Sequence, residues 1–415
     1  MIRHECDFRK RWLEIVKSQG FTYHTFGNRP SSPEQGTYWN EGVCYEFLLA
    51  EVDELEAATQ ELHSLCMQAV GYLYEHPAEL KPFCIPEGML GYVFDSWHRK
   101  SPHVSGRFDF AYDGVSPPKM LEYNADTPTA LIETAIIQWR WLEDPHPGAD
   151  QFNSVHEKLI ARWRELASDR VVYFASLDDG DGEERQTALY MADTAMQGGV
   201  DARWLSIAQL GWDQKHRHFV DEKCAPIANC FKLYPWEWMF REEFGKCLPY
   251  SSTRFFEPPW KSLLSNKAIL PVLWKLFPGH PNLLSTFYEP RGTDYVKKPI
   301  LGREGHNTEI RKEGIISCSV GGVYGSEGYI YQQPAPVPQF DGQHLIIGSW
   351  VIGDDPAGII LREDPSPIAR NTSPSCESIP AAVTVNGDAR HPGGAPPSVA
   401  CCPLDREKRG AESCL

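Results

Sequence analysis

Apolar residues recur at helical spacing along much of the first half of the chain. They predict helices over Arg9–Ser18, Tyr45–Glu75, Thr129–Trp141, Val155–Ala167 and Thr187–Gln197. Short apolar runs predict strands at Val171–Ser176 and Ala202–Ser206, on either side of the last of these helices. This strand–helix–strand order favours layers of helix and sheet.

Strand-like patterns dominate from Tyr295 onward. Four strands are predicted, over Tyr295–Leu301, Gly314–Gly322, Tyr329–Pro334 and Gln343–Ile352. The pairs Asp341-Gly342 and Gly353-Asp354 are good turn formers between them. Together the two halves predict a mixed α/β (α+β) fold.

The character of the chain changes again at about Asn371. Pro, Ser, Ala and Gly dominate beyond that point, and large apolar residues nearly vanish. Such a segment cannot bury enough apolar surface to offset the entropy of ordering its backbone. We therefore expect residues 371–415 to form a disordered tail.

The amino-acid composition limits which partners the protein could bind and where in the cell it could be. The formal net charge of −16 argues against a nucleic-acid binder, because recognition of the phosphate backbone needs clustered Lys and Arg. An acidic surface suits cationic partners such as polyamines, although it also serves simply to keep a protein in solution. No apolar run is long enough to span a bilayer, and the charged segment Met1–Asp7 is unlike a signal peptide. The twelve cysteines include no C-x-x-C pair, which favours reduced thiols and a cytoplasmic location.

The stretch from Gly106 to Asn124 carries the most informative chemistry. Asp113-Gly114 and Pro117-Pro118 mark a loop, so its flanks are predicted to form a hairpin. Centring the strands on this loop places Asp109 opposite Glu122 and Arg107 opposite Asn124. Opposed carboxylates repel unless a cation lies between them, and oxygen ligands of this kind suit Mg²⁺. The alternative is a solvent-facing strand pair with a different register.

Two lysines stand in contexts that suit phosphate. Lys298 lies in the predicted strand Tyr295–Leu301, which leads to the glycine-bearing loop Gly302–Gly305. Lys267 follows Ser265-Asn266, which could cap a helix and place the lysine in its first turn. Each could equally be an ordinary strand-end or surface lysine. The Walker A, nucleophile-elbow, H-E-x-x-H and dinucleotide-binding motifs are absent from the sequence.

Several long motifs in order resemble the glutathionylspermidine synthase family. They are RFD (Arg107–Asp109), LEYNADTPTA (Leu121–Ala130), EERQTALYMADT (Glu183–Thr194), FKLYPWEW (Phe231–Trp238), EPPWKSLLSNKAILPVLWK (Glu257–Lys275), KPILGREGHN (Lys298–Asn307) and the segment Ile347–Asp364. The resemblance implies an ATP-grasp-like synthetase fold over residues 1–370, with a preceding α/β substrate-binding region. It covers the synthetase part of the family only, so the chain resembles stand-alone members without an amidase domain.

The resemblance also implies a reaction and a set of site residues. The family activates a carboxylate with ATP as an acyl phosphate, and an amine then attacks it. By this likeness Arg107 stabilises the transferring phosphate, and Asp109, Glu122 and Asn124 bind Mg²⁺. The ATP-binding set implied is Arg107, Asp109, Lys267, Lys298, Arg303, Glu304, Gly305, Gln332, Gln333 and Arg362. Thr127, Glu183 and Glu184 resemble positions that hold the glutathione-like substrate, although bifunctional members have Ser where Thr127 stands.

Three functions remain open at this point. The leading one is an ATP-dependent carbon–nitrogen ligase that joins glutathione or a related peptide carboxylate to a polyamine or another amine. The second is a ligase of the same mechanism with unrelated acid and amine substrates. The third is an ATP-binding regulatory protein without turnover. The sequence leaves the substrate pair and the oligomeric state open.

Overall fold

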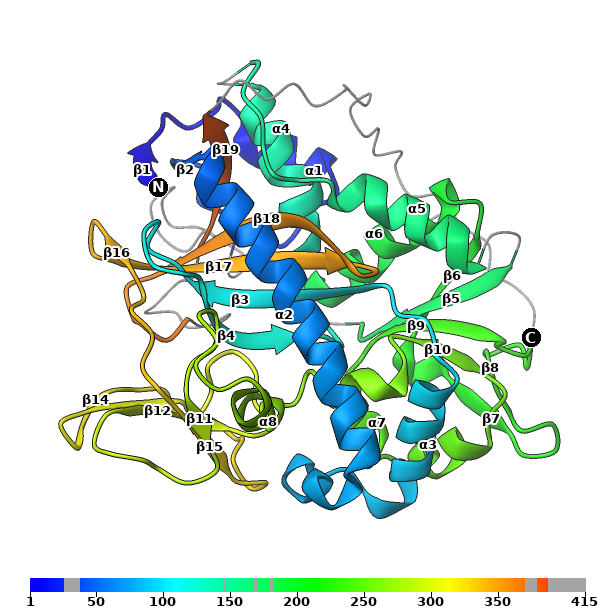
Figure 1. Cartoon of the computed structure of the whole chain (residues 1–415). Helices are drawn as coiled ribbons and strands as arrows, with labels where there is room; N and C mark the ends of the chain where they lie inside the picture. Colours follow the sequence, from blue (N-terminus) through cyan, green and yellow to red (C-terminus); the bar gives the residue numbers. More distant parts are fainter. Residues whose placement is uncertain (26–37, 145–146, 168–169, 179–181, 370–378, 387–415) are drawn as a thin grey trace.

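A computed structural model describes residues 1–25, 38–144, 147–167, 170–178, 182–369 and 379–386 (Figure 1). Three β-sheets and one small hairpin are surrounded by helices in this part of the chain. The largest sheet has the strand order β1-β2-β19-β18-β17-β3-β4, with β16 beside β17. Its strands are β1 (Ile2–Glu5), β2 (Val43–Leu48), β19 (Ile379–Asn386), β18 (Asp355–Asp364), β17 (Gln343–Ile352), β3 (Ser105–Ala111), β4 (Lys119–Asn124) and β16 (Gln339–Phe340).

The long helix α2 (Leu49–Glu75) crosses one face of this largest sheet (Figure 1). It buries Val52, Leu55, Leu62 and Leu73 at helical spacing, and these residues share one core with Phe108 and Ile347 of the sheet. The apolar stripe of the helix therefore packs against the sheet that carries the candidate site.

Two further sheets lie beside it. A parallel sheet has the order β10 (Arg254–Phe256), β9 (Asn229–Leu233), β5 (Val171–Ser176), β6 (Asp201–Ser206), and α5 (Val155–Ala167) and α6 (Glu183–Gln197) pack with it. An antiparallel sheet has the order β11 (Thr286–Phe287), β15 (Tyr329–Gln332), β12 (Tyr295–Pro299), β13 (Glu309–Lys312), β14 (Ile315–Ser319). The hairpin is β7 (Gly211–Asp213) with β8 (His218–Val220).

The remaining helices are short. They are α1 (Trp12–Ser18), α3 (Glu87–His98), α4 (Gln138–Glu143), α7 (Trp236–Met239) and α8 (Ile269–Leu276), with single helical turns or short 3-10 and π segments at Pro77–Phe83, Glu133–Ile137, Ile207–Gln209, Glu243–Tyr250 and Pro259–Ser262. Within the described ranges, no helix combines the length and apolar character that crossing a bilayer requires.

Most sequence-predicted elements are present. The bounds of α5, β5 and β17 coincide with the predicted ranges, and the mixed α/β fold class is confirmed. One helix prediction is wrong at its start: the segment from Tyr45 to Leu48 belongs to β2. Alternate residues Val43, Tyr45 and Phe47 of this strand are buried and its backbone pairs with β1, so tertiary pairing overrides the helical periodicity there.

The predicted disordered tail is also wrong in one segment. Ile379–Asn386 form β19, which pairs with β18 on one side and with β2 on the other. The prediction considered only how much apolar side-chain surface the segment can bury. Backbone hydrogen bonds to a neighbouring strand on each side also stabilise a strand, whatever its side chains. Residues 371–378 and 387–415, the rest of that prediction, lie outside the described residues.

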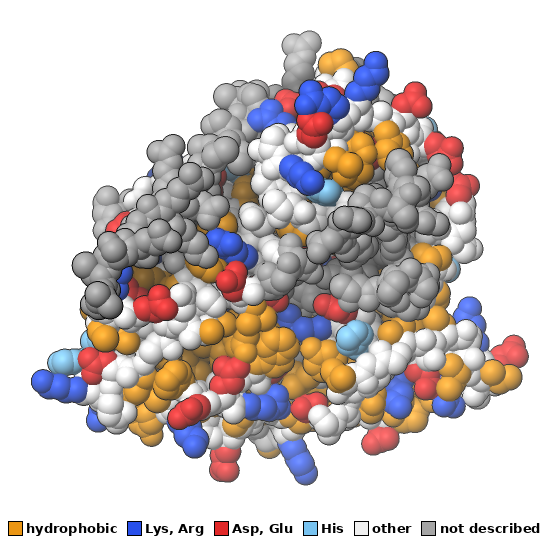
Figure 2. All heavy atoms as spheres, turned by 180° about the vertical axis from the view of Figure 1, so that it is seen from behind, with side chains coloured by type: hydrophobic (Ala, Val, Ile, Leu, Met, Phe, Trp, Pro, Cys, Tyr) orange, Lys and Arg blue, Asp and Glu red, His pale blue; other side chains and the backbone are white. Residues whose placement is uncertain are grey.

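The described surface carries both signs of charge. Acidic and basic side chains are interspersed on the face shown in Figure 2, where the described residues form no continuous basic area.

A buried ion pair fixes the start of β3. The Glu257 carboxylate accepts hydrogen bonds from the backbone N–H groups of Val104 at 3.0 Å and Ser105 at 2.7 Å, and from Lys261 Nζ at 2.8 Å. The side chains of Glu257 and Lys261 are 1% and 0% exposed. Every oxygen of this carboxylate therefore has a partner, and β3 enters the sheet in one position.

Replacing Glu257 by Ala should lower the free energy of unfolding by about 3–5 kcal/mol, because it leaves the Lys261 ammonium buried without its counter-charge. Urea unfolding followed by circular dichroism measures this loss. The matched control is Glu165→Ala, which removes an exposed partner of Arg162 and should cost about 0–1 kcal/mol. Equal losses for the two variants would show that the buried pair does not hold this region.

Candidate functional site

The predicted hairpin is formed by β3 and β4, in the predicted register. Asp109 lies opposite Glu122 and Arg107 lies opposite Asn124, with a bulge directly after Asp109. On the other face, the Phe108 and Tyr123 rings stack with centroids 3.8 Å apart. The apolar face thus anchors the hairpin in the core, and the polar face presents two opposed carboxylates.

Four cationic side chains surround these two carboxylates. Arg107 Nε lies 2.9 Å from Asp109 Oδ1, and Arg362 of β18 also donates to Asp109. Lys267 Nζ lies 3.0 Å from Glu122 Oε2. Lys298 of β12 donates to Gln332 Oε1 at 2.6 Å and to the Leu121 carbonyl at 3.0 Å. The excess of positive charge makes this centre suitable for an anion such as a polyphosphate.

The strand between β3 and β18 leaves room for Arg107. Gly348 of β17 pairs with Asp109, and a Cβ atom added at this glycine would lie 2.8 Å from Arg107 Cδ. A side chain at position 348 would therefore displace the guanidinium, so this glycine is required by close approach.

The charges shift the ionisation of two groups. Burial alone would raise the pKa of Glu122, but the Lys267 and Lys298 ammonium groups outweigh it and hold that pKa below its ordinary value. Burial lowers the pKa of Lys298 to about 8, although the Glu122 carboxylate acts in the opposite direction and Lys267 adds to the lowering. Glu122 is thus ionised at neutral pH. The pKa of Lys298 lies only slightly above neutral pH.

The donor set fits Mg²⁺. Asn124 Nδ2 lies 3.4 Å from Asp109 Oδ2 and 3.3 Å from Glu122 Oε1, so the three side-chain ends converge on one place. Two carboxylates and an amide are hard oxygen donors, and Mg²⁺ takes such ligands together with water and phosphate oxygens. Asp109, Glu122 and Asn124 would hold the ion, and Arg362 and Lys267 now occupy the carboxylate oxygens that it would contact.

Two adjoining cavities meet at this centre. The larger, of about 710 Å³, is lined by Asp109, Glu122, Lys267, Lys298, Arg303, Glu304, Gly305, Gln332, Gln333 and Arg362, among others. The smaller, of about 140 Å³, is lined by Arg107, Asn124, Thr127, Glu183 and Glu184, and it shares Glu122, Lys267, Arg303, Glu304 and Arg362 with the larger. Every residue predicted from the sequence for the site therefore lines one cavity or both.

The guanidinium groups of Arg303 and Arg362 are partly buried and line both cavities. Arg303 Nη2 donates to Thr127 Oγ1 at 2.7 Å, and the guanidinium lies over the Trp238 ring. The Nε atoms of Arg303 and Arg362 are buried, yet neither has a hydrogen-bond partner among the described residues. Buried N–H donors without an acceptor indicate a place where an anionic ligand could bind.

Some features of the site differ from the sequence prediction or were missed by it. Lys267 lies just before α8 and not in its first turn, because Asn266 Oδ1 accepts the Ala268 N–H and the helix starts at Ile269. Glu237 lines the smaller cavity with Glu183 and Glu184, although no role was predicted for it. Its position in the FKLYPWEW stretch was the available signal.

The sequence analysis also missed a buried ion pair between Lys232 and Asp126. Lys232 Nζ lies 2.6 Å from Asp126 Oδ1, and Asp126 Oδ2 accepts the Trp236 N–H at 2.9 Å. This pair joins the loop that carries Thr127 to the segment that carries Glu237. Both residues lie in stretches noted for the family resemblance, but only the fold shows that they meet.

Comparisons with known proteins found similar sequences. A family profile described as "Glutathionylspermidine synthase preATP-grasp" matches residues 3–379. A Haemophilus influenzae protein, whose name gives acid–amine ligase as an assumed activity, is 40% identical over 382 residues, which cover 88% of this chain and 95% of that protein. The bifunctional glutathionylspermidine synthetase/amidase of Escherichia coli is 30% identical over 375 residues, which cover 81% of this chain and 60% of that enzyme.

A solved structure supports the fold alone. A glutathione synthetase-like effector from Globodera pallida in its apo form matches with a TM-score of 0.50 and 11% identity, over 82% of this chain and 89% of that one. Together with the family profile, this likeness confirms the predicted ATP-grasp-like synthetase fold.

Binding of a polyphosphate should be accompanied by proton uptake near pH 8. Lys298 is partly neutral there, since its pKa is about 8, and a bound anion favours the protonated ammonium form. Affinity supplied by Lys298 is thus fully present below that pH and declines as pH rises through it. Calorimetry of tripolyphosphate binding in two buffers of different ionisation enthalpy measures the uptake.

The Lys298→Gln variant provides the control for this titration. It retains the ionisation of the ligand but lacks the lysine, so its proton uptake should be smaller than that of the unaltered chain. Equal uptake by both proteins would show that Lys298 does not contact the anion.

Proposed function

Because the chain belongs to the glutathionylspermidine synthase preATP-grasp family, we propose that it is an ATP-dependent acid–amine ligase. The observation that supports this most strongly is the meeting of two cavities at the Asp109–Glu122 centre. A two-substrate condensation driven by a nucleotide needs such an arrangement, with phosphate transfer at the point where both cavities open.

The proposed reaction has two steps. An oxygen of the substrate carboxylate attacks the γ-phosphorus of Mg-ATP, which forms an acyl phosphate and releases ADP. The amine nitrogen then attacks the acyl carbon and loses a proton, which forms the amide and releases phosphate. The chain's task is chiefly to position the reactants and to stabilise the negative charge that develops on the transferring group.

The larger cavity is assigned to ATP. Lys298, Lys267 and Arg362 are placed to bind the phosphates, and the backbone of the loop from Arg303 to Gly305 adjoins them. Val296, Ile310, Val337 and Ile346 line the same cavity and provide apolar surface for a base, with Gln332 and Gln333 nearby. Arg107 lines the smaller cavity, where it would contact the phosphoryl group as it moves toward the acid.

The smaller cavity is assigned to the acid and the amine. Arg303 offers a positive charge to a carboxylate, while Glu183, Glu184 and Glu237 give the same cavity an acidic wall. This combination suits a peptide acid with its own amino group, such as glutathione, joined to a cationic amine such as a polyamine. Thr127 contacts Arg303 and would fix the substrate-facing position of its guanidinium.

Two alternatives follow from the same site. A ligase with unrelated acid and amine substrates would keep the centre and differ only along the smaller cavity. An ATP-binding regulator would need no competent centre, so the presence of Arg107, both carboxylates and both lysines in one place favours catalysis.

Mg²⁺-dependent release of phosphate from ATP should rise when the correct acid and amine are supplied together, since either alone leaves the sequence of steps incomplete. Glutathione with spermidine is the first pair to test, followed by other peptide acids and amines, and mass spectrometry identifies the amide. Background hydrolysis across a broad panel, with ATP binding intact, would favour the regulatory alternative. Product formed only from other pairs would support the second alternative.

Glu122→Gln should lower this turnover by at least about 100-fold, because it removes a charge from the proposed metal site while preserving size. The fold should survive, since glutamine keeps the size of the side chain and can still accept a hydrogen bond from Lys267. Glu309→Gln, on β13 and paired with Arg311, is the matched control and should leave turnover unchanged. Unchanged turnover and Mg²⁺ dependence in Glu122→Gln would remove the hairpin from the proposed mechanism.

A further inference from the structure

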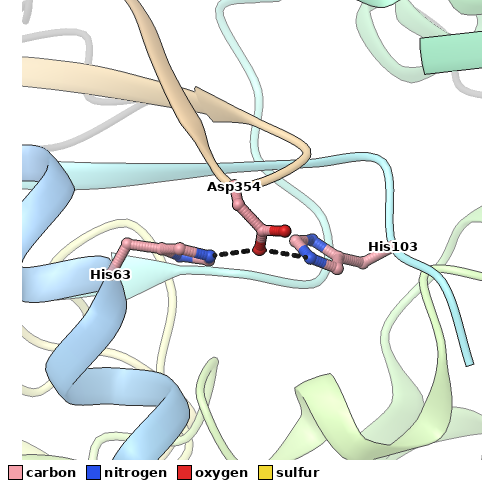
Figure 3. A group of neighbouring side chains, drawn as sticks. All are labelled: His63, His103 and Asp354. Atoms are coloured by element: carbon pink, nitrogen blue, oxygen red, sulfur yellow. Dashed lines mark hydrogen bonds and ion pairs between the residues drawn. The ribbon is translucent and has the colours of Figure 1, made fainter. Parts of the chain in front are cut away.

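A second cluster of ligand-type side chains lies outside both cavities. His63 comes from α2, His103 from the segment that leads into β3, and Asp354 from the turn between β17 and β18 (Figure 3). Asp354 Oδ1 lies 3.0 Å from His63 Nε2 and 3.2 Å from His103 Nε2. The histidine side chains are 3% and 7% exposed, whereas that of Asp354 is 69% exposed.

Two of the three separations between the ligand atoms match those around a small metal ion. All lie within 4.8 Å of one another. Ligands of a tetrahedral Zn²⁺ lie about 2.0–2.1 Å from the ion and hence about 3.3 Å from each other. The two measured nitrogen–oxygen separations are close to that value, so an ion could enter with a small movement of the exposed Asp354.

The surroundings of the histidines also suit metal binding. His63 Nδ1 lies 3.2 Å from the buried Tyr123 hydroxyl, which fixes the ring and directs Nε2 toward Asp354. The His103 ring packs edge-on against Trp260, with centroids 5.4 Å apart.

We propose that His63, His103 and Asp354 form a binding site for a divalent transition metal such as Zn²⁺, with water as the fourth ligand. Two imidazole nitrogens and one carboxylate suit Zn²⁺, Co²⁺ or Ni²⁺, whereas Mg²⁺ prefers oxygen ligands only. The site thus differs in chemistry from the Asp109–Glu122–Asn124 centre. The exposed side of Asp354 gives the ion a path from solvent.

This site would join three elements that support the candidate active site. His103 lies four positions before Arg107 along the chain, and Asp354 lies in the turn that connects β17 to the strand carrying Arg362. Trp350 of β17 pairs with Arg107. A bound ion would therefore hold the start of β3 and the turn of the β17–β18 hairpin against α2. Its main effect would be to raise the stability of the fold.

The competing interpretation needs no ion, because two neutral imidazoles can each donate Nε2–H to Asp354. His103→Gln separates the two interpretations: its side-chain amide can still donate to Asp354, but it is a poor zinc ligand. Asp354→Asn likewise retains an acceptor and loses the charge. The second described group, Asp213, His216 and His218 on the β7–β8 hairpin, supplies the matched control Asp213→Asn.

The test uses the full chain, stripped with a chelator and titrated with Zn²⁺ in millimolar Mg²⁺, which occupies the oxygen-ligand sites. We expect about one tightly bound Zn²⁺ per chain by mass spectrometry of the metal content, and a melting temperature that rises with Zn²⁺ concentration. Co²⁺ in place of Zn²⁺ should give the visible absorption of a tetrahedral centre.

Asp354→Asn and His103→Gln should each weaken Zn²⁺ binding at least about 100-fold, since loss of an outer partner alone costs about 10–100-fold. Asp213→Asn should bind as the unaltered chain does. The proposal is overturned if the unaltered chain binds no stoichiometric Zn²⁺, if both substitutions at the site leave binding unchanged, or if Asp213→Asn alone abolishes it.

Discussion

The repulsion between Asp109 and Glu122 is the constraint on which the site depends. The two carboxylates face each other across one hairpin, in a place from which the Phe108–Tyr123 stack prevents them from turning away. Arg107, Arg362 and Lys267 compensate the charge of the two carboxylates. In the proposed reaction, these cations would contact phosphate oxygens, and Asp109 and Glu122 would hold Mg²⁺. The same side chains then serve stability before binding and phosphate transfer after it.

The scaffold keeps these charges together although they come from distant parts of the chain. Arg362 reaches Asp109 because β17 lies between β3 and β18, and Gly348 of β17 leaves the space that Arg107 needs. Glu257 and Lys261 fix the start of β3 from the opposite end. Lys298 arrives from the antiparallel sheet, whose β12 places it beside Glu122. The charges of the site and its support therefore come from segments that are distant in sequence, and only the fold brings them together.

What the sequence could predict follows from how local each feature is. The Asp109–Glu122 register was predictable because a short loop ties the two strands, so the number of residues on either side decides the pairing. The periodicity of Val155–Ala167 was equally local. In contrast, the strand character of Tyr45–Leu48 and the pairing of Ile379–Asn386 depend on partners far away in sequence. The contacts of Asp126 with Lys232, and of His63 and His103 with Asp354, likewise arise only from long-range topology. The family resemblance could indicate that Lys267, Lys298 and Arg362 belong together, but spacing alone could not.

The most direct test of the proposed function is a structure of the chain with Mg²⁺ and a non-hydrolysable ATP analogue. We predict that the triphosphate lies in the larger cavity, with Mg²⁺ bound by Asp109 and Glu122. Arg362 and Lys267 should have left these carboxylates to contact phosphate oxygens. A triphosphate bound away from Lys298 and Arg362, or a complex in which Arg362 still pairs with Asp109 and no metal reaches Glu122, would contradict it.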